Sequence, residues 1–336
     1  MIKLDMKLEL FQNIKVNANL IFLLFILLNI SCIQQRKEVL EYYPDGQLKS
    51  KYYINDDSIV DGSRVVFYPS GNVYYKENYA SGKNIDSIVF FRDKKNSLPS
   101  EIQIIEKDNS IYVKNFTTSG ELEEEGFYTK DNLRIGIWKF YANNHIKYIK
   151  EFKVIRDTEY TNQLWNLLPN GDTLTTGSSL KYSISNTKIT LGDSIQFLFQ
   201  SAVPTFSMNS SDFVITIPKE FQEQNFNPDF SNYELTSEKE GIQTIQHYSL
   251  SYDSLHKSEK MSIPKTLHNK TIVFDIKPLK TGIDTLRGWF EEFKTVKNYS
   301  NIHNIPWFNL QNTNQLDTIE YQSRKIYFDI PIEVVE

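Results

Sequence analysis

The sequence is poor in cysteine, and this limits its chemistry. Its 336 residues include one cysteine, Cys32, so no disulfide can form within the chain. None of the five histidines falls in a metal-binding spacing such as H-E-x-x-H, and neither a G-x-S-x-G elbow nor a phosphate-binding glycine loop occurs. We therefore expect no metal, no cofactor and no catalytic residues, and predict that the chain is not an enzyme.

Glycine and proline are also scarce, and the chain has no excess of positive charge. The net charge is −5, which provides no electrostatic attraction for nucleic acid, so no nucleic-acid partner is expected. The chain has 13 Gly and 11 Pro but 20 Tyr and 22 Phe, a balance that favours strands over helices. Hydrophobic residues make up 40% of the chain, which is enough to bury a core in two or three domains.

The first 32 residues have the pattern of an export signal. Lys3, Lys7 and Lys15 precede an unbroken apolar run at 20–28, which is too short to span a bilayer but suits a signal-peptide core. Ser31 directly before Cys32 resembles the lipobox of bacterial lipoproteins. That resemblance implies cleavage before Cys32, lipidation of its thiol, a tether at 33–40 and anchoring to a membrane of the cell envelope, which we expect to be the outer membrane. The alternative is an ordinary signal peptide with an incidental cysteine.

The stretch from Tyr42 to Phe152 contains several copies of one hairpin-like sequence pattern. Turn dipeptides typical of tight hairpin loops occur at Asp45-Gly46, Ser70-Gly71, Ser119-Gly120 and Asn143-Asn144. An aromatic stands four positions before the second turn residue in each case: Tyr42, Phe67, Phe116 and Phe140. If each loop has two residues, two further positions should face each other across the hairpin. These are the residue three positions before the second turn residue (Tyr43, Tyr68, Thr117, Tyr141) and the residue two positions after it (Leu48, Val73, Leu122, Ile146).

The spacing of these turns predicts further copies. Gly46 and Gly71 are 25 residues apart, whereas Gly71 and Gly120 are 49 apart, which leaves room for an additional turn near Asp93-Lys94. Another copy is expected to end at Asn170-Gly171.

Three segments within this stretch resemble the bacterial variant of MORN-type repeats: 43–48 (Tyr-Pro-Asp-Gly-Gln-Leu), 68–73 (Tyr-Pro-Ser-Gly-Asn-Val) and 136–141 (Gly-Ile-Trp-Lys-Phe-Tyr). Chains of this YwqK-like kind are often filed as antitoxin components of toxin–antitoxin systems. The resemblance implies an elongated antiparallel sheet of hairpins over 41–160 that serves as an interaction surface.

One face of this sheet is a candidate contact surface. On it we expect Tyr42, Phe67, Phe116 and Phe140, with Lys49, Tyr74, Glu123 and Lys147 as their cross-strand partners. Aromatics among charges suit stacking on sugars or docking to a protein, so the candidate contact residues here are Tyr42, Phe67, Tyr74, Phe116 and Phe140. The alternative is that both aromatic rows only hold neighbouring hairpins together.

The remainder of the chain changes in pattern. Residues 161–179, with Trp165, are expected to cap the sheet as a transition segment. From 180 to 336 we predict an antiparallel β-sandwich that loosely resembles immunoglobulin-like domains of exported bacterial proteins, so the whole fold is all-β. The expected strand-like runs are 180–185, 194–200, 213–218, 243–251, 271–277, 283–293 and 325–335. In the long loop at 295–318, Trp307 and Phe308 either form a partner-binding tip or fold back on the sandwich.

A short motif, Asp followed by Ser or Thr and an aliphatic residue, recurs along the chain. It resembles the acceptor motif of a bacterial O-glycosylation system, which would make the candidate acceptors Ser58, Ser87, Thr173, Ser194, Ser254, Thr285 and Thr318. The alternative is that Asp ends a turn and Ser or Thr opens a strand.

These features together predict an exported, lipid-anchored, non-enzymatic binding or scaffold protein of the cell envelope, with a protein or glycan partner. The rivals are a glycan-active hydrolase, which needs two carboxylates about 5–10 Å apart in one pocket, and a cytosolic antitoxin-like repeat protein.

Overall fold

The computed structural model describes residues 36–106, 108, 110–206, 211–233, 241–296, 315–316 and 319–336. Cys32, Trp307, Phe308 and Thr318, together with the expected signal helix, lie outside the described residues. The fold is nearly all β, as the sequence predicts, and consists of a long antiparallel sheet of successive hairpins and a second, six-stranded sheet. Helical structure in the described part is confined to α2 (Lys257–Ser262) and the short 3₁₀ segment η1 (Lys265–Lys270). No described helix has the length and hydropathy required to cross a membrane.

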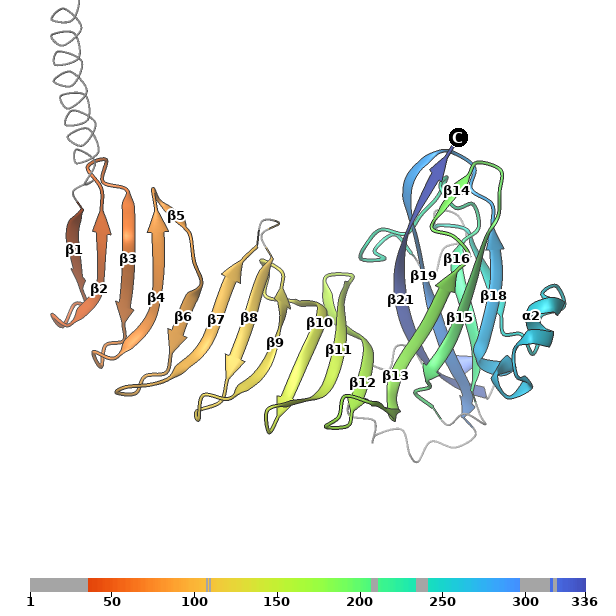
Figure 1. Ribbon diagram of the computed structural model, residues 1–336, viewed down its shortest axis with the longest axis horizontal. Coiled ribbons are helices and arrows are strands. Elements are labelled where there is room, and N and C mark those ends of the chain that lie inside the picture. Colours follow the sequence, from red (N-terminus) through yellow and green to blue (C-terminus); the bar gives the residue numbers. More distant parts are fainter. Residues whose placement is uncertain are drawn as a thin grey trace, which may run out of the picture. The chain divides into compact units, whose positions relative to one another are not determined.

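The chain divides into two compact units at Ser100/Glu101. In the first unit, strands of the long sheet follow the order β1-β2-β3-β4-β6, and β5 pairs with β4 (Figure 1). Their bounds are β1 (Lys37–Tyr42), β2 (Leu48–Ile54), β3 (Val60–Phe67), β4 (Val73–Ala80), β5 (Lys83–Asn84) and β6 (Ile88–Phe91). The first unit is therefore a run of hairpins, in which each strand pairs mainly with its neighbours in sequence.

The predicted hairpin tips are in the right places, but three of their loops are longer than expected. Tyr43 N–H donates to Gln47 O (2.8 Å), and Gly46 N–H donates to Tyr43 O (2.9 Å). Gly46 has φ +85°, a left-handed conformation that glycine adopts without steric cost. This is a three-residue loop with a glycine bulge, and the loops at Gly71 and Gly120 repeat it.

The extra loop residue shifts the cross-strand partners by one. Tyr42, Phe67 and Phe116 pair with Leu48, Val73 and Leu122, so the predicted facing of Tyr43, Tyr68 and Thr117 with these aliphatics is wrong. The expected partners Lys49, Tyr74, Glu123 and Lys147 are wrong as well, since Phe140 pairs with Tyr148. The two-residue loop at Asn143-Asn144 matches the prediction: φ is +50° and +62°, and Tyr141 pairs with Ile146.

Both additional copies are present. The connection after β6 spans 92–98, where the missing turn was predicted. At the other expected copy, Leu168 N–H donates to Asp172 O (2.8 Å), and Gly171 has φ +89°. The same three-residue loop also occurs without glycine, at 55–59 and 129–133, where Ser58 and Asn132 take positive φ.

In the second unit, the long sheet follows the order β7-β8-β9-β10-β11-β12-β13-β15-β18 (Figure 1). Its strands are β7 (Pro99–Ile105, beginning just before the boundary), β8 (Ile111–Phe116), β9 (Leu122–Tyr128), β10 (Arg134–Ala142), β11 (His145–Ile155), β12 (Thr158–Leu167), β13 (Thr173–Ile184), β15 (Ile195–Val203) and β18 (Thr271–Ile276). Residues 161–179, expected to cap the sheet, instead lie largely in β12 and β13, each of which is paired on both sides.

The second sheet follows the order β14-β21-β19-β16-β17, with β20 on β21, and only β14 and β21 are parallel. Its strands are β14 (Lys188–Thr190), β16 (Asp212–Pro218), β17 (Thr244–Tyr248), β19 (Gly282–Val296), β20 (Gln315–Leu316) and β21 (Ile319–Val335). All seven strand-like runs predicted beyond residue 180 overlap a strand. Buried and half-exposed residues alternate along β15, so this strand turns one face to the core.

The core of the second unit lies between its two sheets. Phe197 and Phe199 on β15 stack on Phe274 of β18, with ring centroids 5.1 and 5.8 Å apart, and Phe199 also meets Phe328 of β21 at 4.8 Å. Each fully buried phenylalanine of this kind contributes about 1.5–3 kcal/mol to stability. A second cluster packs Tyr160 of β12 against Tyr327 of β21.

Polar groups also join β12 to β21. Asn162 is fully buried: its side-chain amide donates to Tyr327 O (2.9 Å), and its side-chain oxygen accepts from Tyr327 N–H (2.8 Å). Arg324, 2% exposed, donates to Asn162 O (2.9 Å) and to Thr161 O. Strand β12 of the long sheet is thereby fixed to the second sheet within this unit.

Candidate functional site

The predicted contact residues of the sheet differ in exposure. Tyr42 is 57% exposed and Tyr74 is 39% exposed, whereas Phe67, Phe116 and Phe140 are half-buried. The structure therefore leaves two of the five rings open to solvent. Nothing is described of the other two predicted contact residues, Trp307 and Phe308.

Tyr74 belongs to an aromatic group within the first unit. Its ring centroid lies 4.7 Å from that of Tyr68, 5.2 Å from Tyr75 and 5.8 Å from Phe90. Offset and edge-on contacts of this kind each contribute about 0.5–1.5 kcal/mol beyond their area. Tyr74 therefore supports neighbouring strands with one side of its ring while the rest of the ring faces solvent.

Tyrosine hydroxyls connect successive hairpins of the first unit. The Tyr43 hydroxyl donates to Phe67 O (2.6 Å), and the Tyr68 hydroxyl donates to Phe91 O (2.9 Å). In each case the bond crosses from one hairpin tip to the strand that enters the next. The tyrosine three positions before the turn glycine thus acts as a repeated structural staple.

Phe140 lies in a cation–aromatic cluster formed by Arg134, Trp138, Phe140, Tyr148 and Lys150. Phe140 stacks on Tyr148 with centroids 4.5 Å apart, and the Lys150 ammonium lies 5.4 Å from the Phe140 ring. The Arg134 guanidinium lies 4.8 Å from the Trp138 ring. Burial lowers the pKa of Lys150. These charges are already held against rings of the same chain, so the cluster reads as a structural element that a partner could reach only at its rim.

The position of the Trp138 side chain explains why residue 126 is glycine. The Trp138 side chain is fully buried, and its indole N–H donates to Phe127 O (3.1 Å). A Cβ built on Gly126 would lie 2.3 Å from the indole ring, so only glycine fits beneath it.

A buried carboxylate, Glu125, organises the other face of these strands. It accepts hydrogen bonds from the hydroxyls of Tyr112 (2.7 Å) and Tyr141 (2.7 Å) and from the Lys139 ammonium (3.2 Å). Burial and the bond to Glu125 raise the pKa of Tyr141 to about 12, so both tyrosines stay protonated and donate. This network supports the hairpins.

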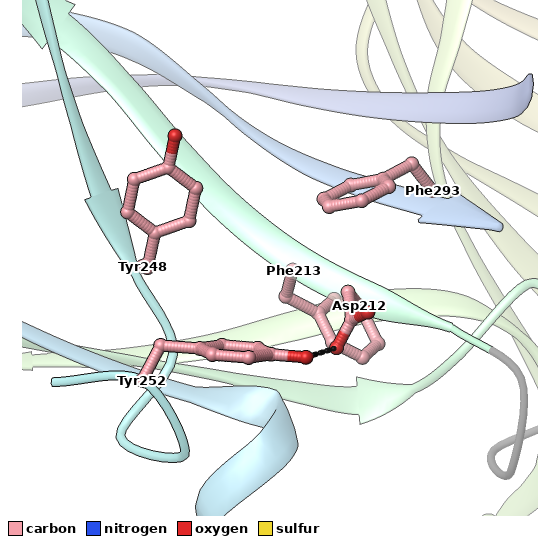
Figure 2. A pocket seen from close by; sticks show the side chains of 5 residues that line it. All are labelled: Asp212, Phe213, Tyr248, Tyr252 and Phe293. Atoms are coloured by element: carbon pink, nitrogen blue, oxygen red, sulfur yellow. Dashed lines mark hydrogen bonds between the residues drawn. The ribbon is translucent and has the colours of Figure 1, made fainter.

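An aromatic pocket lies in the second unit, at one end of the six-stranded sheet. Its volume is about 370 Å³, and its lining residues are Asp212, Phe213, Tyr248, Tyr252 and Phe293. Figure 2 shows the rings of Tyr248 and Phe293 set apart from each other, with the Tyr252 hydroxyl directed at Asp212.

The strand register explains why these side chains meet. Asp212 of β16 pairs with Phe293 of β19, and Val214, two residues further along β16, pairs with Tyr248 of β17. Side chains two residues apart on a strand share a face, so Asp212, Phe293 and Tyr248 lie on the same face. Tyr252 comes from the turn after β17, where its N–H donates to Ser249 O (2.8 Å). Tyr248 and Tyr252 are 50% and 67% exposed, so the pocket is open to solvent.

Sequence reasoning missed this pocket. Its residues come from three strands and a turn, Asp212 and Phe293 are 81 positions apart, and no local motif connects them. The one local signal is Tyr248 followed by Tyr252 at the end of a short strand, in a region that otherwise buries its aromatics.

A second, smaller pocket of about 150 Å³ is more polar. Its lining includes Lys219, Glu220, His247 and Asp275. Asp275 is also bound to His256: the ring nitrogens of His256 lie 3.1 Å from Asp275 Oδ2 and 2.5 Å from Asp253 Oδ2. The imidazole thus bridges the start of α2 to the edge strand β18.

The candidate glycosylation residues occupy varied positions. Ser58, Thr173, Ser194 and Ser254 are exposed, while Ser87 and Thr285 are half-buried. Asp86 and Asp284 each accept a hydrogen bond from the N–H of the following Ser87 or Thr285, both at 2.7 Å. Asp86 and Ser87 directly precede β6, which favours the turn interpretation at that motif, whereas Asp284 and Thr285 already lie within β19. The exposed serines and threonine are the accessible acceptors.

Within the described ranges, no three His, Cys, Asp or Glu side chains gather in a way that would hold a metal ion. No protein-family model matches the chain, and no curated protein matches it.

Proposed function

We propose that this chain is an exported, lipid-anchored, non-enzymatic binding or scaffold protein of the cell envelope. The charged lead, short apolar run and Ser31-Cys32 of its N-terminal sequence support export and anchoring. Its hairpin sheet and the loops of its sandwich supply the binding surfaces, and a protein or glycan of the envelope is the partner.

One observation carries the binding role. Among the described hydrophobic residues of the first unit, Val66 alone is buried, and even it is 8% exposed. A sheet whose described residues bury so little apolar surface is not one layer of a closed hydrophobic core. Because Tyr42 and Tyr74 stay exposed on it, the unit offers aromatic side chains of the kind that are enriched at interfaces.

Export and anchoring are tested by labelling the chain with radioactive palmitate in its native host. We expect uptake of the label and recovery in the membrane fraction, and loss of both in Cys32→Ala. Ser31→Ala, which keeps a small residue before the cysteine, is the matched control and should behave like the wild type. Recovery of the wild-type protein in the soluble fraction, without radioactive label, would contradict the proposal and favour the cytosolic antitoxin-like alternative.

Binding is tested by chemical cross-linking in intact cell envelopes. The Tyr42→Ala/Tyr74→Ala double variant should lose the adducts that the wild type forms. Tyr182→Ala removes a tyrosine of similar exposure, 49%, from the second unit and should keep them. Identical adducts in all three proteins would remove the sheet surface from the proposal, and release of soluble fragments from envelope glycan by the purified protein would favour the hydrolase instead.

A further inference from the structure

The aromatic pocket of the second unit carries its own charge. Asp212 forms no ion pair with any described residue, and its carboxylate accepts a hydrogen bond from the Tyr252 hydroxyl at 3.3 Å. The nearest cation along β19 is Lys294, whose ammonium lies 5.0 Å from the Phe206 ring. Among the described residues, the pocket therefore combines a carboxylate that has no ion-pair partner with several aromatic rings.

This combination discriminates between classes of ligand. The Tyr248 hydroxyl already donates to Gln246 Oε1 (3.0 Å), and that of Tyr252 donates to Asp212, so few polar groups are left for the many hydroxyls of a sugar. A neutral apolar ligand would remove water from the Asp212 carboxylate without replacing its interactions, which costs free energy. A cation instead gains from both the carboxylate and the rings, whose faces are electron-rich.

The polar and aromatic groups that line the pocket also indicate which type of cation it suits. A primary ammonium brings three N–H donors that each require an acceptor, whereas a quaternary ammonium presents methyl groups that need none. Methyl groups suit a lining made mainly of ring carbon. The volume of about 370 Å³ leaves room for a trimethylammonium group and a short substituent.

We propose that the pocket lined by Asp212, Tyr248, Tyr252 and Phe293 binds an organic cation of the trimethylammonium class, an inference that rests on the proposed binding function and names a ligand for its sandwich part. Tyr248, Tyr252 and Phe293 surround the methyl groups, and Asp212 compensates the charge.

The test is isothermal titration calorimetry on the full-length protein in detergent. Three probes separate the contributions: choline, its neutral isostere of similar size, 3,3-dimethylbutan-1-ol, and ethanolamine, the smaller primary ammonium that lacks the methyl groups. We expect saturable binding of choline, with the other two weaker by about tenfold, which is within the range that cation–π contacts support. Raising the salt concentration should weaken choline binding and leave the isostere unchanged.

Variants locate the site. Asp212→Asn and Tyr252→Ala should each weaken choline binding by about 3- to 30-fold, whereas Tyr252→Phe, which keeps the ring, should stay within about threefold. Tyr182→Ala, an exposed tyrosine outside the pocket, is the control and should bind as the wild type does. Circular dichroism confirms that each variant is folded.

Absence of choline binding, equal binding of the neutral isostere or of ethanolamine, or binding that survives both Asp212→Asn and Tyr252→Ala would each overturn this inference. None of these outcomes changes the result expected from palmitate labelling or from cross-linking of the Tyr42→Ala/Tyr74→Ala variant, so the proposed function is tested separately.

Discussion

At the scale of single residues, His256 has the most informative surroundings. Burial alone would lower its pKa, but hydrogen bonds to Asp253 and Asp275 outweigh burial, so the pKa is raised above its usual value near 6.5. Lys257, Glu259 and Lys260 on α2 are its other charged neighbours along the chain, and partial burial together with a charged His256 lowers the pKa of His247. The protonated imidazole therefore links two carboxylates.

This arrangement predicts a pH-dependent contribution to stability. A raised pKa in the folded state means that the contribution is fully present below about pH 6.5 and is lost as the pH rises through the folded pKa. We expect the stability difference between wild type and His256→Gln, measured by urea denaturation, to be larger at pH 6 than at pH 9.

His145→Gln is the control for that measurement. His145 lies at the tip of the β10–β11 hairpin, where its ring contacts the backbone oxygen of Asn143. Its substitution should change stability by a similar amount at both pH values. An equal effect of His256→Gln at pH 6 and pH 9 would show that His256 does not change charge in this window.

At the scale of elements, the hairpins depend on contacts from one tip to the next. Tyr43 and Tyr68 occupy equivalent positions in successive copies, and each donates its hydroxyl to a backbone oxygen in the following copy. We expect Tyr43→Phe and Tyr68→Phe each to lower the free energy of unfolding by about 0.5–1.5 kcal/mol, because each removes one hydrogen bond and keeps the ring. Hydrogen exchange of the β3 and β4 amides should show the local loosening.

Tyr42→Phe is the matched control, since Tyr42 precedes Tyr43 but is 57% exposed, and its hydroxyl bonds to no described residue. It should change stability by no more than about 0.5 kcal/mol. If Tyr42→Phe and Tyr43→Phe were equally costly, the tip-to-tip bond would not be a staple.

The hairpin tips at Gly46, Gly71, Gly120 and Asn144 could be predicted, because a turn dipeptide and a preceding aromatic recur there at fixed spacing. The loop length was predicted wrongly, although the sequence contains the signal. Pro44 and Pro169 stand directly before the turn dipeptide, where proline favours a type I turn that needs a following left-handed glycine, and Ala142 stands at that place in the true two-residue loop. The glycine-free loops at 55–59 and 129–133 lacked such a marker.

The candidate pocket could not have been predicted in the same way. The runs that become β16, β17 and β19 were predicted, but not their order in the sheet. The meeting of Asp212 with Phe293 and Tyr248 depends on that order and on register, which no local pattern in these strands encodes.

At the scale of the whole molecule, hydrophobic burial is distributed unevenly. Nearly all of the buried phenylalanines and isoleucines belong to the second unit, where two sheets face each other, whereas the first unit depends on cross-strand pairs and aromatic contacts. Stability of the second unit therefore rests on its core and on the polar junction between β12 and β21.

Arg324 is the residue on which that junction should depend most. Its guanidinium is buried and donates to the backbone oxygens of Thr161 and Asn162, so removing it takes a hydrogen-bond donor away from each of these oxygens. Arg324→Met should lower the free energy of unfolding by about 1–3 kcal/mol and expose the β11–β12 hairpin to limited proteolysis. Lys188→Met, which removes an exposed ion pair with Glu333 on the same strand β21, should cost at most about 1 kcal/mol. Equal costs and equal proteolysis would mean that the hydrophobic contact of Tyr160 with Tyr327 holds β12 in place without the arginine. A larger cost for Arg324→Met, with cleavage confined to the β11–β12 hairpin, would identify the buried guanidinium as the group that fixes β12 to the second sheet.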